Sequence, residues 1–282
     1  MEKLKLIVIA MRDRLMPSRN NRYVGNFKSW EDASQCCQKG YGDDVILDKV
    51  RAATHEVVAG RAAFERDSVL FYHAEYNWPL LTALWRLRAQ CHNGIGVLDF
   101  GGALGSTYWQ NRKMFEGIGR LRWSVVEQPK TVACGQKEFQ NEQLVFYESV
   151  DECFAHEKID LVFLGSVLNY IPDAQELLRM ILAYGCDSVI VERTVVLNKA
   201  VKDRIVVQHV PPSIYPASYP LRLFSEASIR ATFESMYDLE VEMTDPFPPL
   251  VLLNPWQVAY SKSYFWRAKR GKQQDADRNY CP

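Results

Sequence analysis

The sequence predicts an α/β fold in which a Rossmann-like parallel sheet follows a helical N-terminal extension. From Gly96 onward, short apolar runs alternate with helical segments, a pattern typical of a parallel sheet covered by helices. The first apolar run, residues 97–100, leads into a turn with three glycines between positions 101 and 105. Glycines there allow a ligand to approach the backbone closely. We therefore expect a nucleotide-type cradle at the end of the first strand.

Composition argues against several classes of protein. The 282 residues are 48% hydrophobic and include 34 basic and 34 acidic side chains, so no overall basic field favours nucleic acid. No apolar segment approaches the roughly 20 residues of a membrane span. Residues 4–11 are apolar but short, and we interpret them as a packed element rather than a signal peptide. The odd number of cysteines, without C-x-x-C spacing, and the scattered histidines predict a cytoplasmic protein without a metal site.

Residues 1–95 are expected to form the mainly helical extension. Ser29 is a favourable N-cap and is followed by acidic residues in the first helical turn. Residues 46–58 have apolar side chains at helical spacing, and Pro79 suits the first turn of a further helix. Residues 65–72 mix charged and aromatic side chains, and we interpret the aromatic ones as core.

Residues 96–270 contain the alternating pattern, and residues 271–282 form a polar tail. The expected strands are residues 97–100, 121–126, 143–147, 159–164 and 188–191, followed by a late hairpin of residues 239–243 and 263–267. Helices are expected after Ser106, after Pro129, after Asp173 with Glu176 completing a capping box, and after Ser225. The stretch between residue 191 and Ser225 is expected to be a long connection that forms a substrate wall.

The glycine turn distinguishes between cofactors. A dinucleotide fingerprint, G-x-G-x-x-G, counted from Gly101 requires glycine where this chain has Ala103 and Ser106. Instead, Asp99 ends the strand just before the turn. An acid followed by a small-residue turn resembles motif I of class I S-adenosylmethionine (SAM) methyltransferases. Ala103 departs from that motif, which usually has glycine at this place.

The resemblance extends over residues 96–268, because five alternating strands, a helix and two final strands resemble the seven-stranded sheet of that class. In addition, the stretches Tyr23-Val24-Gly25, Ser29-Trp30-Glu31 and Glu65-Arg66-Asp67 resemble a family of little-characterised bacterial methyltransferases. Genes of that family are often found near genes for surface-polysaccharide synthesis. The resemblance implies SAM as cofactor and O- or N-methylation of a small-molecule or saccharide acceptor.

The resemblance also assigns cofactor-binding residues by position. Asp99 and the turn with Gly101, Gly102 and Gly105 would hold the methionine end of SAM, with the carboxylate facing its ammonium group. Glu127 ends the second strand, and a carboxylate there can accept hydrogen bonds from both ribose hydroxyls. Glu148 and Ser149 are expected near the adenine, and Gly165 and Ser166 are expected beside the sulfonium. A polar pair in a turn accounts equally well for residues 148 and 149.

Two residues are candidates for catalysis. Methyl transfer from a sulfonium is an in-line displacement, so the protein mainly aligns the nucleophile and excludes water, and a base helps a hydroxyl nucleophile. His209 is the best base by its intrinsic pKa, although a single histidine in an apolar run is often structural. Asn169 and Tyr170 stand where similar small-molecule methyltransferases have paired histidines. Any role of Asn169 or Tyr170 is expected to be positioning or hydrogen bonding, and packing in the core or in a loop accounts equally well for Tyr170.

Two other functions remain open on the sequence. The departures at Ala103, Asn169 and Tyr170 allow a catalytically degenerate SAM-binding module that regulates a partner. An NAD-dependent sugar oxidoreductase or epimerase is the other alternative, and the failed glycine spacing argues against it. The expected partner is a small-molecule or saccharide acceptor, with neither nucleic acid nor a membrane span.

Overall fold

A computed structural model describes residues 22–37, 44–90, 94–197, 202–210, 217–245, 250–251 and 258–269. The following regions named in the sequence analysis lie outside these ranges: the apolar residues 4–11, the polar tail 271–282, and residues 198–201 and 211–216 of the expected substrate wall.

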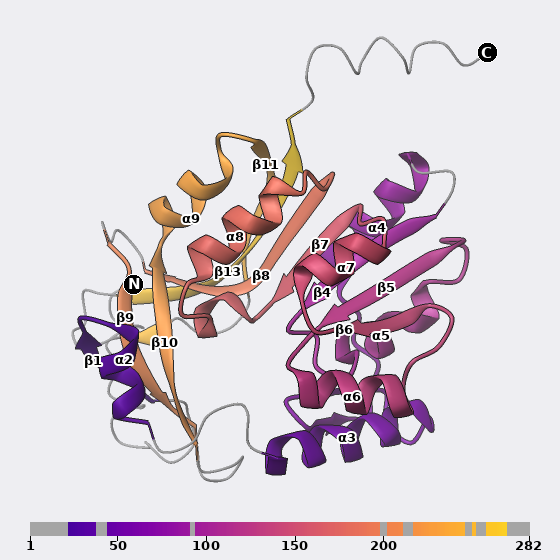
Figure 1. Cartoon of the computed structure of the whole chain (residues 1–282), viewed down its shortest axis with the longest axis horizontal. Helices are drawn as coiled ribbons and strands as arrows, with labels where there is room; N and C mark the ends of the chain where they lie inside the picture. The colour runs from indigo at the N-terminus through magenta and orange to yellow at the C-terminus, as the bar shows by residue number, and fades with distance from the viewer. Residues whose placement is uncertain are drawn as a thin grey trace.

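A sheet covered by helices on both faces forms the centre of the molecule (Figure 1). Seven of its strands follow the order β6-β5-β4-β7-β8-β13-β11, in which β13 runs antiparallel to its neighbours β8 and β11, and the other six strands are parallel to one another. This is the predicted Rossmann-like, seven-stranded arrangement. Its strands are β4 (Ile95–Phe100), β5 (Leu121–Val126), β6 (Leu144–Tyr147), β7 (Leu161–Gly165), β8 (Ser188–Leu197), β11 (Tyr237–Thr244) and β13 (Val258–Ala268), with the short β12 (Leu250–Val251) paired to β13.

Alternate residues of the central strands enter two hydrophobic clusters, one on each face of the sheet. Leu98 and Val162 face one cluster, while Val97 and Phe163 face the other. The first cluster is completed by α7 (Val150–His156), α8 (Ala174–Ala183) and α9 (Glu226–Phe233), and the second by α4 (Trp78–Gln90), α5 (Ser106–Asn111), η1 (Arg112–Met114) and α6 (Pro129–Glu138).

Helix caps explain where several helices begin. The hydroxyl oxygen of Ser225 accepts a hydrogen bond from the backbone N–H of Ser228, as predicted for the start of α9. The predicted capping box at α8 is wrong, because Asp173 does not have the extended backbone of an N-cap and Glu176 pairs with Arg179 instead. Helix α7, capped by Ser149, was not predicted.

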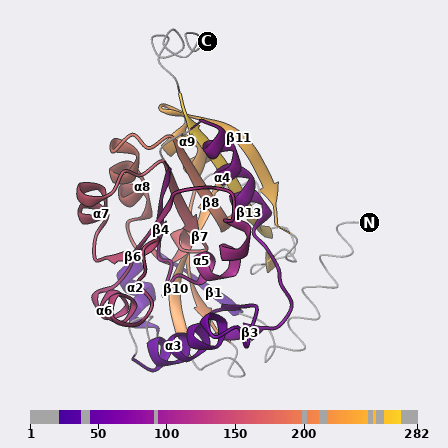
Figure 2. The same cartoon turned by 90° about the vertical axis from the view of Figure 1, so that its right-hand side faces the viewer.

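The N-terminal part contains the predicted helices α2 (Trp30–Gln35), α3 (Asp44–Val58) and α4, and also three strands. Strands β2 (Phe64–Arg66) and β3 (Val69–Phe71) form a hairpin that packs against α3 (Figure 2). Its two turn residues, Asp67 and Ser68, have φ of 51° and 66°, the left-handed values that a two-residue type I′ hairpin turn requires.

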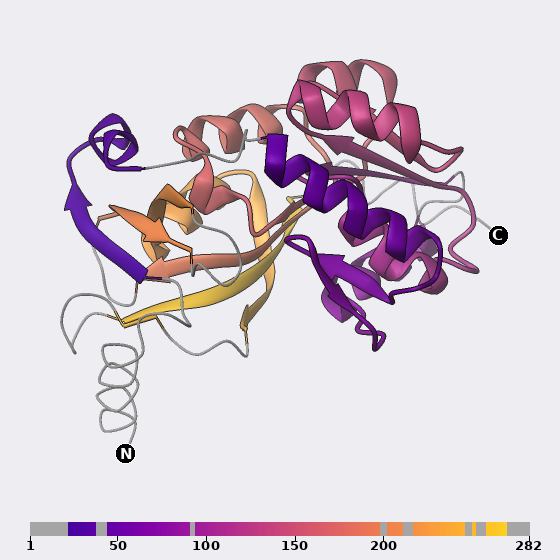
Figure 3. The same ribbon diagram turned by 90° about the horizontal axis from the view of Figure 1, so that it is seen from below.

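The expected long connection after residue 191 is wrong, because most of the described part of that stretch is strand. Strand β8 continues to Leu197, and β9 (Arg204–His209) and β10 (Ser218–Ser225) follow as an antiparallel pair. Strand β1 (Arg22–Phe27) adds to β9, and β10 joins the end of β8 in parallel (Figure 3). This extension lies beyond the end of β8, at the carboxyl end of the main sheet.

Asn169 connects the extension to the main sheet. Its side chain is buried in the turn η2 (Leu168–Tyr170). The amide Nδ2 donates to the carbonyl oxygens of Val195 (3.0 Å) and Arg222 (2.6 Å), and Oδ1 accepts from the N–H of Val195 (2.9 Å). One side chain therefore satisfies backbone groups on both β8 and β10.

We expect Asn169→Ala to lower the free energy of unfolding by about 3 kcal/mol, because it leaves buried backbone groups unpaired at roughly 1–3 kcal/mol each. Urea unfolding followed by circular dichroism measures this change. Gln140→Ala, which removes an exposed amide, is the matched control and should change stability by less than about 0.5 kcal/mol. Equal stability of the two variants would contradict the structural role of Asn169.

Candidate functional site

A cavity of about 620 Å³ opens at the carboxyl ends of β4, β5 and β7, beside Arg193 in the middle of β8. Strand β4 pairs with β5 on one side and with β7 on the other, so the strand order reverses at β4. The cavity therefore lies at the topological switch point of the sheet. Helices α3 and α5 and the tip of the β2–β3 hairpin complete the walls. Ligands of open α/β sheets bind at this place.

The predicted glycine turn forms the floor of the cavity. Gly101 has a φ of 71°, and a Cβ there would lie 2.6 Å from Val167 Cγ2. A Cβ on Gly102 would lie 2.6 Å from Oδ2 of Asp99. Both positions therefore exclude a larger side chain. Ala103 takes a φ of 50°, a left-handed conformation that costs a non-glycine residue roughly 1–2 kcal/mol.

Asp99 lies under this turn and is only 1% exposed. The indole Nε1 of Trp123 donates a hydrogen bond to its Oδ2 at 3.1 Å. Burial raises the pKa of Asp99 to about 7, and the negative charges of Glu127 and Glu192 act in the same direction. The folded protein thus holds a carboxyl group that changes charge near neutral pH.

Glu127 follows β5 and faces the same turn. Its Oε1 accepts from the N–H of Ala103 at 3.3 Å, and its Oε2 accepts from the N–H of Gln128 at 2.8 Å. Burial raises the pKa of Glu127 as well. Two carboxyl groups from neighbouring strand ends therefore border the glycine turn, as the sequence predicts.

The structure brings most, but not all, of the other predicted site residues to the cavity. Glu148, Gly165, Ser166 and Tyr170 line it together with Asp99, Gly101, Gly102 and Glu127. Gly105 and Ser149 are not among the lining residues. Gly105 precedes α5 with a φ of 87°, and Ser149 accepts from the N–H of Glu152 as the N-cap of α7.

His209 does not line the cavity either; it is exposed at the end of β9. Successive strand residues point to opposite faces, and the preceding residue, Gln208, is buried. Oε1 of Gln208 accepts a hydrogen bond from the hydroxyl of Tyr170 at 2.7 Å. The predicted base is therefore on the face opposite the one that reaches Tyr170.

The hairpin residues Glu65, Arg66 and Asp67 line the cavity, which the sequence analysis did not foresee for these side chains. Oε1 of Glu65 accepts from the hydroxyl of Ser106 in the first turn of α5, and its Oε2 accepts from the N–H of Ser68 at 3.1 Å. Burial raises the pKa of Glu65. The feature of the sequence that could have indicated this site is the run of three charged residues, Glu65 to Asp67, within a segment of mainly apolar and aromatic residues.

A β-bulge places Arg193 at the cavity. The pairing of β8 with β13 shifts between Lys262 and Tyr264, and Arg193 there has a φ of 49°. Its Nε donates to Oγ of Ser166 at 2.8 Å, and its backbone N–H donates to Oγ of Ser263 at 3.1 Å. The bulge and these bonds fix the Arg193 side chain beside Ser166.

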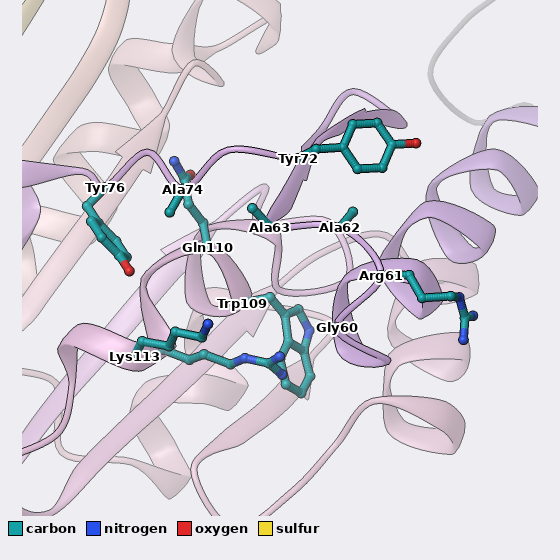
Figure 4. Close-up of a pocket in the computed structure, with 11 residues that line it drawn as sticks. Gly60, Arg61, Ala62, Ala63, Tyr72, Ala74, Tyr76, Trp109, Gln110 and Lys113 are labelled. Carbon is teal, nitrogen blue, oxygen red and sulfur yellow. The ribbon is translucent and has the colours of Figure 1, made fainter.

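A smaller cavity of about 290 Å³ lies farther along the hairpin, between Tyr72, Tyr76 and Trp109 (Figure 4). Gln110 of α5 lines both cavities, and Lys113 contributes a positive charge to the smaller one. Arg61 points away from the other labelled side chains and pairs with Glu56.

None of the helices in the described part of the chain combines the length and apolar character needed to cross a membrane. Within the same residues, no group of three His, Cys, Asp or Glu side chains is arranged to hold a metal ion. The described cysteines, Cys36, Cys37, Cys134, Cys153 and Cys186, are all free.

No protein-family model matches the sequence, and no curated protein matches it. Among solved structures, the chain is similar to the N-terminal domain of EvdMO1 with SAH bound, with 12% identity, 82% of this chain and 100% of that chain covered, and a TM-score of 0.46. It is also similar to magnesium protoporphyrin IX methyltransferase from Synechocystis PCC 6803 (12% identity, 80% and 99% covered, TM-score 0.41). A third is CalS10, an amino pentose methyltransferase from Micromonospora echinaspora (10% identity, 67% and 89% covered, TM-score 0.41). At this level of similarity, these structures do not show a family for the chain.

The raised pKa of Asp99 predicts a pH-dependent stability. Because the folded-state pKa of about 7 exceeds the ordinary aspartate pKa of 3.8, the folded state retains the proton between these two pH values. Its contribution to stability is therefore complete below pH 3.8 and is lost as the pH rises through about 7, with a slope of up to about 1.4 kcal/mol per pH unit.

Asp99→Asn keeps an acceptor for Trp123 and removes the titration, so the unfolding free energy of this variant should fall less between pH 4 and pH 8 than that of the parent. Asp48→Asn, at an exposed position of α3, is the control and should follow the parent. If the unfolding free energy changed with pH equally in all three proteins, the assignment of this titration to Asp99 would be contradicted. Urea unfolding at several pH values measures them.

Proposed function

We propose that this protein is a SAM-dependent methyltransferase with a small-molecule or saccharide acceptor. The observation that supports it best is the pair of carboxyl groups, Asp99 and Glu127, on either side of a glycine turn at the switch point of the sheet. SAM has an ammonium group at one end of its amino-acid part and two ribose hydroxyls farther along. Asp99, after β4, would face the ammonium group, and Glu127, after the neighbouring strand β5, would face the ribose hydroxyls.

The residues present suit this cofactor. The buried carboxyl of Asp99 lies directly under Gly102, where it can face an ammonium group that rests on the turn. Glu127 uses one lone pair of each carboxylate oxygen on a backbone N–H and retains others for hydroxyl donors. When bound, SAM would supply a methyl group already activated as part of a sulfonium ion.

The chain's own residues would then orient the acceptor and exclude water. Ser166, Val167 and Tyr170 line the cavity after β7, beyond the cofactor-binding turn. The hydroxyl of Tyr170 is held by Gln208, so we assign Tyr170 a positioning role. The volume of about 620 Å³ is within the range of small-molecule pockets, roughly 300–1,000 Å³.

The same geometry disfavours a nicotinamide dinucleotide. A pyrophosphate needs close backbone approach along the turn and no negative charge beside it. Here Ala103 has a side chain at the middle of the turn, and the carboxyl group of Asp99 lies directly under Gly102. We therefore place the oxidoreductase alternative behind methyl transfer.

Calorimetric titration with S-adenosylhomocysteine (SAH), the demethylated product, tests the proposal. We expect SAH to bind and NAD⁺ not to bind at comparable concentrations. Glu127→Gln should weaken SAH binding by about tenfold to a hundredfold, because hydrogen bonds to a charged group contribute roughly 1.5–3 kcal/mol. Glu142→Gln, an exposed position at the opposite end of β6, is the control and should bind like the parent.

Failure of the parent to bind SAH would overturn the proposal. If SAH binds, transfer of a tritiated methyl group from SAM to a mixture of small saccharides or to a cell extract distinguishes an enzyme from a SAM-binding module. A protein that binds SAH but transfers no methyl group to any fraction would support the regulatory alternative.

The pH dependence of SAH binding tests the role of Asp99 separately. An ammonium group favours the ionised carboxyl, so below the pKa of about 7 binding requires loss of a proton. We expect the SAH affinity to rise up to about tenfold per pH unit between pH 5.5 and 7 and to level off above that range. Asp99→Asn should bind more weakly and show a flatter profile. An equally steep profile in this variant would assign the titration to another group.

A further inference from the structure

We propose that Arg66 and Arg193 form a recognition site for an anionic group, a phosphate or a carboxylate, on the methyl acceptor. This inference rests on the proposed function and deepens it, since it assigns a charge to the acceptor. Arg66 and Arg193 are the two basic side chains among the residues that line the main cavity.

The strand order places Arg193 beyond the cofactor. The glycine turn follows β4, Glu127 follows β5, and β7 separates β4 from β8. Gly165 at the end of β7 pairs with Glu192, so Arg193, in the middle of β8, lies level with the end of β7. Neighbouring strands lie about 4.8 Å apart, so this part of β8 is about 10 Å from the end of β4, on the side away from β5. A cofactor that extends from Glu127 to the turn therefore leaves the space beside Arg193 for the acceptor.

The backbone around Arg193 is arranged to hold its side chain in place. Arg193 and Ser166 both have positive φ, 49° and 59°, and their side chains are joined by the bond from Nε to Oγ. The N–H of Ser166 donates to the carbonyl oxygen of Glu192 at 2.9 Å. Strained conformations of this kind cost roughly 1–3 kcal/mol each and gather at ligand clamps and active sites.

Arg66 approaches from the hairpin. Its guanidinium lies over the rings of Phe64 and Phe71, with the Cζ atom 5.5 and 5.8 Å from the ring centroids. Its ion pair with Glu75 is loose at 3.7 Å, and the Glu75 side chain is 65% exposed. Burial and the nearby charge of Arg193 both lower the pKa of Arg66, so the two guanidinium groups repel each other without a ligand.

The neighbouring acids leave donors for a ligand. Glu192 is 3.4 Å from Nη2 of Arg193, but its other oxygen accepts from Nδ2 of Asn77 at 2.7 Å. Asp67, at the turn of the hairpin, is near enough for its charge to act on both Arg66 and Arg193, but it makes no ion pair within 4.0 Å in the described part of the chain. Within those residues, the Arg193 guanidinium makes one hydrogen bond and that of Arg66 makes none. A phosphate or carboxylate between them would accept the remaining N–H groups.

The test uses protein saturated with SAH and three probes that share a sugar ring: glucose, glucose 6-phosphate and glucuronate. Calorimetry should show tighter binding of one or both anionic probes than of glucose. Arg66→Gln and Arg193→Gln should each weaken binding of that anionic probe by about tenfold or more and leave SAH binding within twofold of the parent. Arg193→Lys keeps the charge but not the planar guanidinium, so its affinity for that probe should lie between those of the glutamine variants and the parent. The preferred probe tells phosphate from carboxylate.

Arg179→Gln removes the same charge from an exposed ion pair on α8 and should leave all affinities unchanged. The inference is overturned if the parent binds neither anion more tightly than glucose. It is also overturned if the arginine variants lose SAH affinity but keep that for 5′-methylthioadenosine, because the guanidinium groups would then bind the carboxylate of the cofactor. That second outcome leaves the proposed function intact, whereas failure of the parent to bind SAH removes both.

Discussion

The buried carboxyl of Asp99 is the constraint on which the arrangement of the site depends. Its side chain fills the space directly beneath Gly102, so the turn can close only if residue 102 has no Cβ. Trp123 supplies the hydrogen bond that makes this burial tolerable. Because the turn closes over Asp99, α5 begins at once with Ser106, which in turn binds Glu65 of the hairpin. The floor and one wall of the cavity therefore follow from one acid.

The register of the sheet determines what this acid faces. In the pairing of β4 with β5, Phe100 lies opposite Val126, and the N–H of Gly101 donates to the Val126 carbonyl at 2.9 Å. The next residue on β5 is Glu127, so the two acids meet at the turn. Burial, and after it the charge of Glu127, raises the pKa of Asp99 and disfavours its ionised form. A cation bound at the turn would offset this cost, and this is the reason for proposing a ligand that carries an ammonium group.

The sequence predicts those parts of the structure that depend on neighbours along the chain. The strand, glycine turn and helix around Asp99, and the cap at Ser225, are local and were expected. Strands β1 and β9 pair across most of the chain, which no local pattern reveals. The hairpin turn was hidden because Asp67 and Ser68 occupy positions that usually hold Asn and Gly.

The same reasoning explains why the site was only partly predicted. Arg193 is directed by a bulge, which is a property of β8 and β13 together and is invisible in either strand alone. His209 was selected for its intrinsic pKa, but the alternation of β9 gives the inward position to Gln208. Asn169 stands where similar methyltransferases have a histidine, and the structure shows that its amide binds backbone groups of β8 and β10.

Backbone strain identifies the cavity independently of any motif. In the described part of the chain, the non-glycine residues with positive φ are Asp67, Ser68, Ala103, Ser166 and Arg193. Four of them line the main cavity, and the fifth, Ser68, donates its N–H to Glu65 in the cavity wall. These residues come from the hairpin, from the turn after β4, from the position after β7 and from the bulge in β8, so no single loop accounts for their gathering. Since each such conformation costs roughly 1–3 kcal/mol, their concentration around one cavity is expected where ligand binding, rather than stability, determines the backbone.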